Sequence, residues 1–282
     1  MLKELVNNIY KEFIYSGHFM SLGISIVVWA GCLLLNYSPS VLSLLSIYFL
    51  IQPIYWVDRI YGLKEDFIGN KERVEYIQGN IRNLKIIIFI YLLFYTLITF
   101  SFSSHMLPYG FLLLLLGLGY GRYFKKVTKY IVGFKNFYVS IFFAIMYIYI
   151  MFFHNIQRLD FIVVFFVIFV FLRALLVQIF IDLKDLDVDK SHGLKTFAVI
   201  FGRSKVLNIV HFLNVLSVLP IAYLLFLGYV DIYFGLVIVF LVLRSATYIY
   251  KAKNDVSYKI YIMLSFDFLF LGGYVLLNKL LL

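Results

Sequence analysis

Long apolar segments constrain this chain more than any other feature of its sequence. A membrane-spanning helix needs about 20 largely apolar residues to cross about 30 Å of hydrocarbon. Apolar segments of roughly this length recur nine times in the 282 residues, and the fourth is short and glycine-rich. The pattern predicts an all-α membrane protein with about nine transmembrane helices. The segments are residues 19–35, 40–57, 84–103, 106–121, 132–153, 160–181, 207–228, 230–250 and 259–278.

The composition agrees with a bilayer environment. Apolar residues make up 63% of the chain and charged residues 14%, whereas soluble domains are only about half apolar. Residues 1–18 form a polar, amphipathic N-terminal segment without the features of a cleaved secretory signal. Cys32 lies inside the first apolar segment and offers neither a disulfide nor a metal-ligand pattern. We expect residues 1–282 to form a single transmembrane domain.

Basic residues are distributed unevenly between the two ends of the apolar segments. Most of the 25 Lys and Arg lie in the N-terminal segment and after the second, fourth, sixth and eighth apolar segments. Arg244 is counted with the residues that follow the eighth segment. Only Arg158 and Lys279 lie on the opposite side. The positive-inside rule therefore predicts a multi-pass protein of the cell membrane with a cytoplasmic N-terminus and cytoplasmic even-numbered loops. The net charge of +10 is then an orientation signal, and we expect no nucleic-acid partner.

The sixth apolar segment ends in a regular set of carboxylates. Asp182, Asp185 and Asp189 recur at i, i+3 and i+7, so on an α-helix they fall within about 60° of arc. Crowded like charges are unfavourable unless a cation lies among them, and Mg²⁺ bridges carboxylate oxygens to substrate phosphates. The spacing indicates a metal site for a diphosphate, and the alternative is a solvated acidic loop. Asp187 points about 140° away from Asp182, as expected of a solvated charge.

A second acidic loop, residues 56–73, follows the second apolar segment. Asp58 and Asp66 lie two helical turns apart, with Glu65 beside the second and Arg73 beyond it. The loop predicts further metal ligands that complement the first set. The alternative is an ordinary helix end of mixed charge.

A basic loop, residues 120–136, follows the fourth apolar segment. Its basic residues are interleaved with tyrosines, which suits the clamping of phosphate oxygens beside an apolar chain. The alternative is a set of basic side chains that extend to the membrane interface. The basic candidates are Arg122, Lys125, Lys126 and Lys135.

The carboxylate loop resembles the second motif of the UbiA superfamily of intramembrane prenyltransferases. Its pattern, D-x-x-D-x-x-x-D-x-x-x-G-x-x-T, is met by Asp182, Asp185, Asp189, Gly193 and Thr196, and FAVIFG follows. The resemblance covers most of the chain, including the acidic loops after the second and sixth helices and the basic loop after the fourth. It implies a single all-helical domain around a central cavity open to lipid, with the diphosphate held through Mg²⁺ at the cytoplasmic mouth.

The chain departs from the first motif of that family, N-D-x-x-D-x-x-x-D followed by an arginine. With Arg73 as the anchor, Asp58 replaces the asparagine, Arg59 the first aspartate and Gly62 the central aspartate, while Asp66 retains the last. Two acidic positions are therefore missing. Three interpretations remain open: a metal site rearranged onto the remaining carboxylates, a divergent activity, or a catalytically weak member.

The resemblance implies Mg²⁺-dependent transfer of an isoprenoid chain from a prenyl diphosphate to a lipophilic or aromatic acceptor within membrane lipid. A UbiA-type terpene cyclase that acts on the prenyl diphosphate alone is the alternative, and a non-enzymatic transporter or scaffold is a third. The implied catalytic and metal-binding residues are Asp58, Asp66, Asp182, Asp185 and Asp189. The implied diphosphate ligands are Lys125, Lys126, Lys135, Arg73 and Arg122. The implied residues of the substrate cavity are Tyr61, Tyr120 and Asn136.

Two charges remain deep within the apolar segments. Arg173 lies nine residues before Asp182, and Asp267 lies about nine residues into the last segment, which places both about 13 Å below the same surface. A lone charge inside a membrane helix costs at least about 2.5–3.5 kcal/mol. We therefore expect Arg173 and Asp267 to face the interior and to pair.

Overall fold

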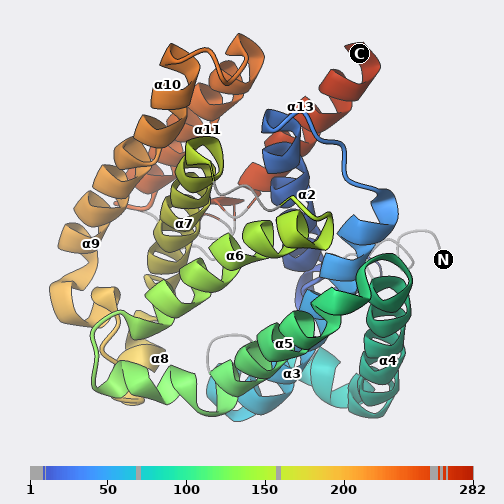
Figure 1. Cartoon of the computed structure of the whole chain (residues 1–282). Coiled ribbons are helices and arrows are strands. Elements are labelled where there is room, and N and C mark those ends of the chain that lie inside the picture. The colour runs from blue at the N-terminus through green and yellow to red at the C-terminus, as the bar shows by residue number, and fades with distance from the viewer. Residues whose placement is uncertain are drawn as a thin grey trace. The chain divides into compact units, whose positions relative to one another are not determined.

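The computed structural model is all-α. It describes residue 9 and residues 11–67, 71–156, 160–254, 260, 263–264 and 266–281. Within these residues every regular element is an α-helix or a short 3-10 helix, and no strand is present. The predicted fold class is therefore confirmed, and Figure 1 shows the helices in chain order.

The chain divides into two compact units, each described on its own. The first holds residues 1–25 and 40–125, and the second holds residues 26–39 and 126–282. Two helices, α2 (His18–Leu34) and the 3-10 helix η2 (Phe124–Lys129), cross the boundary. The first unit contains α3 (Val41–Asp66), α4 (Lys71–Ser103), the 3-10 helix η1 (Ser104–Met106) and α5 (Leu107–Arg122). The second unit contains α6 (Phe134–Phe153), α7 (Phe161–Asp182), α8 (Leu186–Ser191), α9 (Phe197–Leu216), α10 (Val218–Phe226), α11 (Ile232–Lys251) and α13 (Asp267–Leu281).

Six helical segments of the described chain are long and apolar enough to cross a membrane. The molecule is thus a multi-pass membrane protein, but the expected count of nine spans is not confirmed. One reason is that α2 and the apolar part of α13 fall below the length of a full span. The other is that α4, η1 and α5, expected as two spans, form one helical run of 52 residues.

The first unit is built on α3, which packs against both α4 and α5. Trp56 of α3 is buried in one apolar cluster with Ile77 and Leu84 of α4. On another side of α3, Gly117 lets α5 approach closely, because an added Cβ would lie 2.3 Å from the side chain of Ile54. The acidic loop that begins at residue 56 is therefore carried by a well-packed helix.

Residues 11–17, here called the N-terminal strap, are held on α3 by polar side chains. Gln52 Nε2 donates a hydrogen bond to the carbonyl oxygen of Ser16 at 2.8 Å. Arg59 Nη1 donates to the carbonyl oxygen of Ile14 at 3.2 Å. Arg59 stands where the family motif has its first aspartate, so this position holds a tether for the strap.

Glu12 joins the strap to three helices. Its carboxylate lies 3.0 Å from His18 Nε2 of α2 and accepts a hydrogen bond from the Tyr76 hydroxyl of α4. The second ring nitrogen of His18 lies 2.7 Å from the Tyr48 hydroxyl of α3. The hydrogen bond with His18, aided by the one from Tyr76, outweighs burial and lowers the pKa of Glu12 to about 2.

The second unit is built around α7, which contacts α6, α9 and α10. Leu176 and Phe180 of α7 are fully buried in a cluster with Val206 and Val210 of α9. Ile249 of α11 belongs to the same cluster. This packing fixes the end of α7, from which the carboxylate loop leaves.

A polar network crosses the apolar interior of the second unit. Arg173 of α7 donates to Asn214 Oδ1 and to Ser245 Oγ, both at 2.7 Å, and forms an ion pair with Asp267 of α13. The predicted pairing is confirmed. Arg244 also pairs with Asp267. Its expected place after the eighth helix is wrong, because it lies within α11 and faces the same carboxylate.

We predict that Asp267 contributes more to stability than Arg173. Asp267→Leu leaves two largely buried arginine side chains without a carboxylate, whereas Arg173→Met leaves Asp267 paired with Arg244. Breaking a buried pair typically costs about 3–5 kcal/mol. The two losses should not add in the double variant, because both remove the same contact. Thermal unfolding in detergent measures all three variants. Simple additivity, or a smaller loss for Asp267→Leu, would contradict the network.

We also predict acid-induced release of the strap. The pKa of Glu12 is lowered from 4.5 to about 2, so its carboxylate contributes stability that is complete above pH 4.5 and is lost as the pH falls toward 2. A spin label at the exposed position Phe13, introduced as Phe13→Cys, should become mobile over this range. Adding Glu12→Gln should leave its mobility nearly constant with pH. Identical pH profiles with and without Glu12→Gln would refute the prediction.

Candidate active site

The start of α6 is tied to the chain that follows the carboxylate loop. Gly133 N–H donates to the Lys195 carbonyl oxygen at 2.8 Å, and Lys195 N–H donates to the Thr128 carbonyl oxygen at 2.8 Å. Gly133 has a φ of 67°, and an added Cβ would lie 2.1 Å from the ring of Phe197, so both backbone and packing require glycine. These bonds bring the basic loop and the carboxylate loop together.

The three aspartates do not share one continuous helix. α7 ends at Asp182, residues 183–185 form a turn, and α8 begins at Leu186. The expectation of one helical face for Asp182, Asp185 and Asp189 is therefore wrong. The turn separates the middle aspartate from the other two.

Lys135 of α6 joins the outer two aspartates. Its Nζ lies 2.9 Å from Asp182 Oδ1 and 2.8 Å from Asp189 Oδ2. Asn136 Nδ2 donates to Asp182 Oδ2 at 2.8 Å, which fixes the plane of that carboxylate. The side chains of Lys135, Asp182 and Asp189 are only 12%, 6% and 7% exposed, so their interactions are weakly screened by water. We call these four residues the lysine-bridged cluster.

Asp185 lies apart from this cluster. Its carboxylate pairs with the neighbouring Lys184 and is 29% exposed. Asp187 is exposed, as the sequence predicted. The sequence did not predict the pairing of Lys184 with Asp185, because adjacent residues in the expected continuous helix would point in different directions.

The chemistry of the cluster fits a hard divalent cation. Oxygens of Asp182 and Asp189 converge on one cationic centre, the Lys135 ammonium, and Asn136 Oδ1 is buried without a hydrogen-bond partner. In the described residues no three His, Cys, Asp or Glu side chains lie together as a complete metal site. Mg²⁺, however, commonly takes one or two carboxylates and completes its shell with water and substrate phosphates.

The acidic loop of the first motif lies in the first unit. Asp58 of α3 lies close against α5, because an added Cβ on Gly121 would be 2.7 Å from Asp58 Oδ1. Arg73 lies in the first turn of α4 and is half-buried. The side chains of Glu65 and Asp66 lie outside the described part of the chain, so their metal-binding role stays a prediction.

The remaining basic and aromatic candidates are half-buried or exposed. Lys126, in the second unit, is exposed. Arg122 at the end of α5 is exposed and lies 5.3 Å from the centre of the Tyr123 ring. Lys125 and Tyr120 are half-buried in the first unit, and Tyr61 is 55% exposed. Among the basic-loop candidates in the second unit, Lys135 and Asn136 contact the aspartates.

The sequence and the fold were compared with known protein families and solved structures. A model described as the UbiA prenyltransferase family matches residues 26–268. No curated protein matches the sequence significantly.

Solved structures with a similar fold share little sequence identity with the chain. The apo structure of a UbiA homolog from Aeropyrum pernix K1 has a TM-score of 0.71 and 14% identity, covering 92% of this chain and 98% of that one. A UbiA homolog from Archaeoglobus fulgidus, bound to GPP and Mg²⁺, has a TM-score of 0.66 and 16% identity, with coverages of 94% and 99%. A digeranylgeranylglyceryl phosphate synthase structure has a TM-score of 0.59 and 16% identity, covering 96% of each chain.

We predict that removal of the bridging ammonium makes the cluster depend on an added cation. Lys135→Met leaves two buried carboxylates without their shared counter-charge, so its melting temperature in chelator should fall well below that of the wild type. Mg²⁺ should then raise the melting temperature of this variant more than that of the wild type. Lys126→Met removes an exposed lysine from the same loop and should behave like the wild type. An equal Mg²⁺ response in all three proteins would contradict the proposed fit.

Proposed function

The chain belongs to the UbiA prenyltransferase family, and we propose that it transfers an isoprenoid chain from a prenyl diphosphate to a lipophilic or aromatic acceptor. The observation that carries the proposal is the lysine-bridged cluster. One ammonium lies within hydrogen-bond distance of two carboxylates in a nearly dry site at the end of a membrane-embedded helix. Such a site suits a substrate whose head is a polyanion and whose tail is apolar.

The residues of the cluster have distinct roles in this proposal. Asp182 and Asp189 would hold the cation that accompanies the diphosphate, and Asn136 keeps Asp182 in the required orientation. Lys135 donates N–H bonds to the carboxylates in the absence of substrate and turns them toward phosphate oxygens when substrate binds. Its positive charge then stabilises the charge that develops on the diphosphate as the allylic C–O bond breaks. Burial of the cluster limits capture of the carbocation by water.

A bound Mg²⁺ would neutralise the diphosphate and make it a better leaving group. The proposal of this metal is supported by the oxygen donors of the cluster and by the similar Archaeoglobus fulgidus structures, which are bound to GPP or DMAPP with Mg²⁺. The first-motif residues Asp58 and Asp66 are proposed as additional metal ligands, and Arg73, Arg122, Lys125 and Lys126 as additional phosphate ligands. Tyr61 and Tyr120 are proposed to line the substrate cavity.

We propose a cytoplasmic location for the cluster, because the loops at this end of the helices carry most of the basic residues. The single-domain organisation of residues 1–282 stays a prediction. The family model supports it, since the matched residues include parts of both compact units.

The reaction is tested with a panel of prenyl diphosphates of about ten to twenty carbons, given with and without quinone precursors and polar-lipid acceptors. Mass spectrometry should detect a prenylated acceptor in Mg²⁺ and none in chelator. A cyclic hydrocarbon formed from the diphosphate alone would support the alternative, a terpene cyclase. The absence of any diphosphate consumption would reject both enzymes.

We predict unequal effects of the three aspartates on this activity. Asp182→Asn and Asp189→Asn should each lower kcat by about 10²–10³-fold, because each removes a preorganised charge from the buried cluster. The double variant should lose little more than either single variant, since the two carboxylates act as one unit. Asp185→Asn should cost less, and Asp187→Asn, an exposed control, should remain close to the wild type. Full activity of Asp182→Asn in Mg²⁺ would contradict the proposed role of Asp182 in metal binding.

A further inference from the structure

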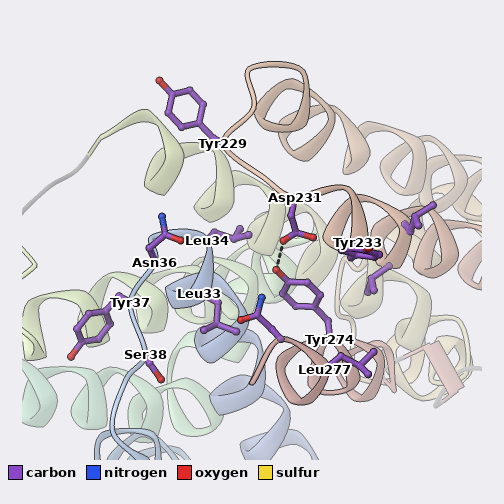
Figure 2. Close-up of a pocket in the computed structure, with 13 residues that line it drawn as sticks. Leu33, Leu34, Asn36, Tyr37, Ser38, Tyr229, Asp231, Tyr233, Tyr274 and Leu277 are labelled. Carbon is purple, nitrogen blue, oxygen red and sulfur yellow. Dashed lines mark hydrogen bonds between the residues drawn. The ribbon is translucent and has the colours of Figure 1, made fainter. Parts of the chain in front are cut away.

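The second unit contains a cavity of about 910 Å³ that the proposed chemistry does not use. It is lined by residues from the end of α2, the start of α11 and the last turns of α13 (Figure 2). The lysine-bridged cluster lies at the opposite helix ends. α9 begins just after the carboxylate loop, and α9 and α10 together extend for 30 residues, or up to about 45 Å, before the chain reaches the cavity.

The lining of the cavity combines apolar side chains with polar groups. The apolar side chains include those of Leu33, Leu34, Leu236, Val237 and Leu277. The polar groups include carboxamides, hydroxyls and one carboxylate, from Asn36, Ser38, Asp231, Tyr274 and Asn278. Figure 2 shows Asp231 and Tyr274 joined by a hydrogen bond beside Leu33. A volume of this size, mostly apolar with a few polar groups, is typical of a small-molecule site.

The charges of the lining disfavour a phosphate-bearing ligand. None of the 13 residues drawn in Figure 2 is a lysine or an arginine. The one carboxylate, Asp231, caps α11 by accepting from Phe234 N–H at 2.8 Å and also accepts from the Tyr274 hydroxyl. Both of its oxygens are therefore already engaged by neutral donors. What the cavity offers is uncharged hydrogen bonding above an apolar surface.

The length of α2 sets the depth expected for two of these polar residues. α2 has 17 residues and extends about 25 Å, which is less than the roughly 30 Å of the hydrocarbon core. We therefore expect Asn36 and Ser38, which follow α2, to lie near the inner limit of the head-group region. Polar groups at this depth need partners, because the adjacent hydrocarbon supplies none.

We propose that the cavity binds a membrane lipid with an uncharged, hydroxyl-bearing head group. The head-group hydroxyls hydrogen-bond to the carboxamides of Asn36 and Asn278, and an acyl chain lies against the leucine side chains. Binding here fills the gap left by the short α2 and links α2 to α11 and α13. The site is separate from the lysine-bridged cluster, so the inference does not depend on the proposed function.

The test uses delipidated full-length protein in detergent and three probes read by native mass spectrometry and thermal unfolding. Dioleoylglycerol has the neutral head and the tails, dioleoylphosphatidylglycerol adds a phosphate, and glycerol lacks the tails. We expect dioleoylglycerol to be retained in one copy and to raise the melting temperature, with at least tenfold weaker binding of the other two. Equal binding of the phospholipid would overturn the proposed selectivity, and the absence of retained dioleoylglycerol would overturn the site.

Two substitutions on α11 locate the binding. Val237→Trp fills the cavity and should abolish retention of dioleoylglycerol, whereas Val239→Trp adds the same side chain at a 49% exposed position outside the lining and should not. Asn278→Leu removes a head-group contact without filling the space, and should weaken binding at least tenfold even if Val237→Trp fails to fold. Unchanged binding in Asn278→Leu would refute the assigned contacts. Loss of binding in Val239→Trp would refute the location.

Discussion

A charge that leaves water for a membrane-embedded interior must find partners within the protein, and this requirement organises the second unit. Two clusters meet it in opposite ways. The lysine-bridged cluster sets one cation, Lys135, against two anions, Asp182 and Asp189, so its formal charge is +1 − 2 = −1. The network around Asp267 sets two cations against one anion, so its formal charge is +2 − 1 = +1.

The two imbalances are resolved by different means. The excess positive charge of the Asp267 network is spread over neutral acceptors, because Arg173 also bonds to Asn214 and Arg244 also bonds to the Met263 carbonyl oxygen. Arg244 lies 5.0 Å from the centre of the Phe270 ring, which adds a cation–π contact. In the lysine-bridged cluster, Asn136 donates to Asp182 and keeps its own buried Oδ1 without a hydrogen-bond partner. The Asp267 network is therefore complete as structure, and the lysine-bridged cluster is suited to an additional cation.

The sequence predicted the features that depend on composition and depth. Apolar length predicted the helical class, and the matching depths of Arg173 and Asp267 predicted their pairing. It did not predict the turn after Asp182, because a spacing of i, i+3 and i+7 fits a continuous helix equally well. Selecting Lys135 among the basic-loop residues depended on backbone bonds that join Gly133 and Thr128 to Lys195, which are far apart in the sequence. Arg59 replaces the first aspartate of the family motif and binds the N-terminal strap through the Ile14 carbonyl oxygen. No motif in the sequence predicted this contact.

The Asp267 network also has a consequence for how the chain is made. Arg173 enters the membrane before its partners exist, since Asn214, Ser245 and Asp267 follow it by 41, 72 and 94 residues. At a translation rate of about 5–20 residues per second, the arginine waits roughly 5–20 s for its carboxylate. Asn214 is synthesised first and Ser245 second, so two neutral acceptors can bind the Arg173 guanidinium before the ion pair with Asp267 forms. The order of these partners along the chain thus allows Arg173 to gain hydrogen bonds one after another during biogenesis. Insertion of α13 then supplies the carboxylate of Asp267.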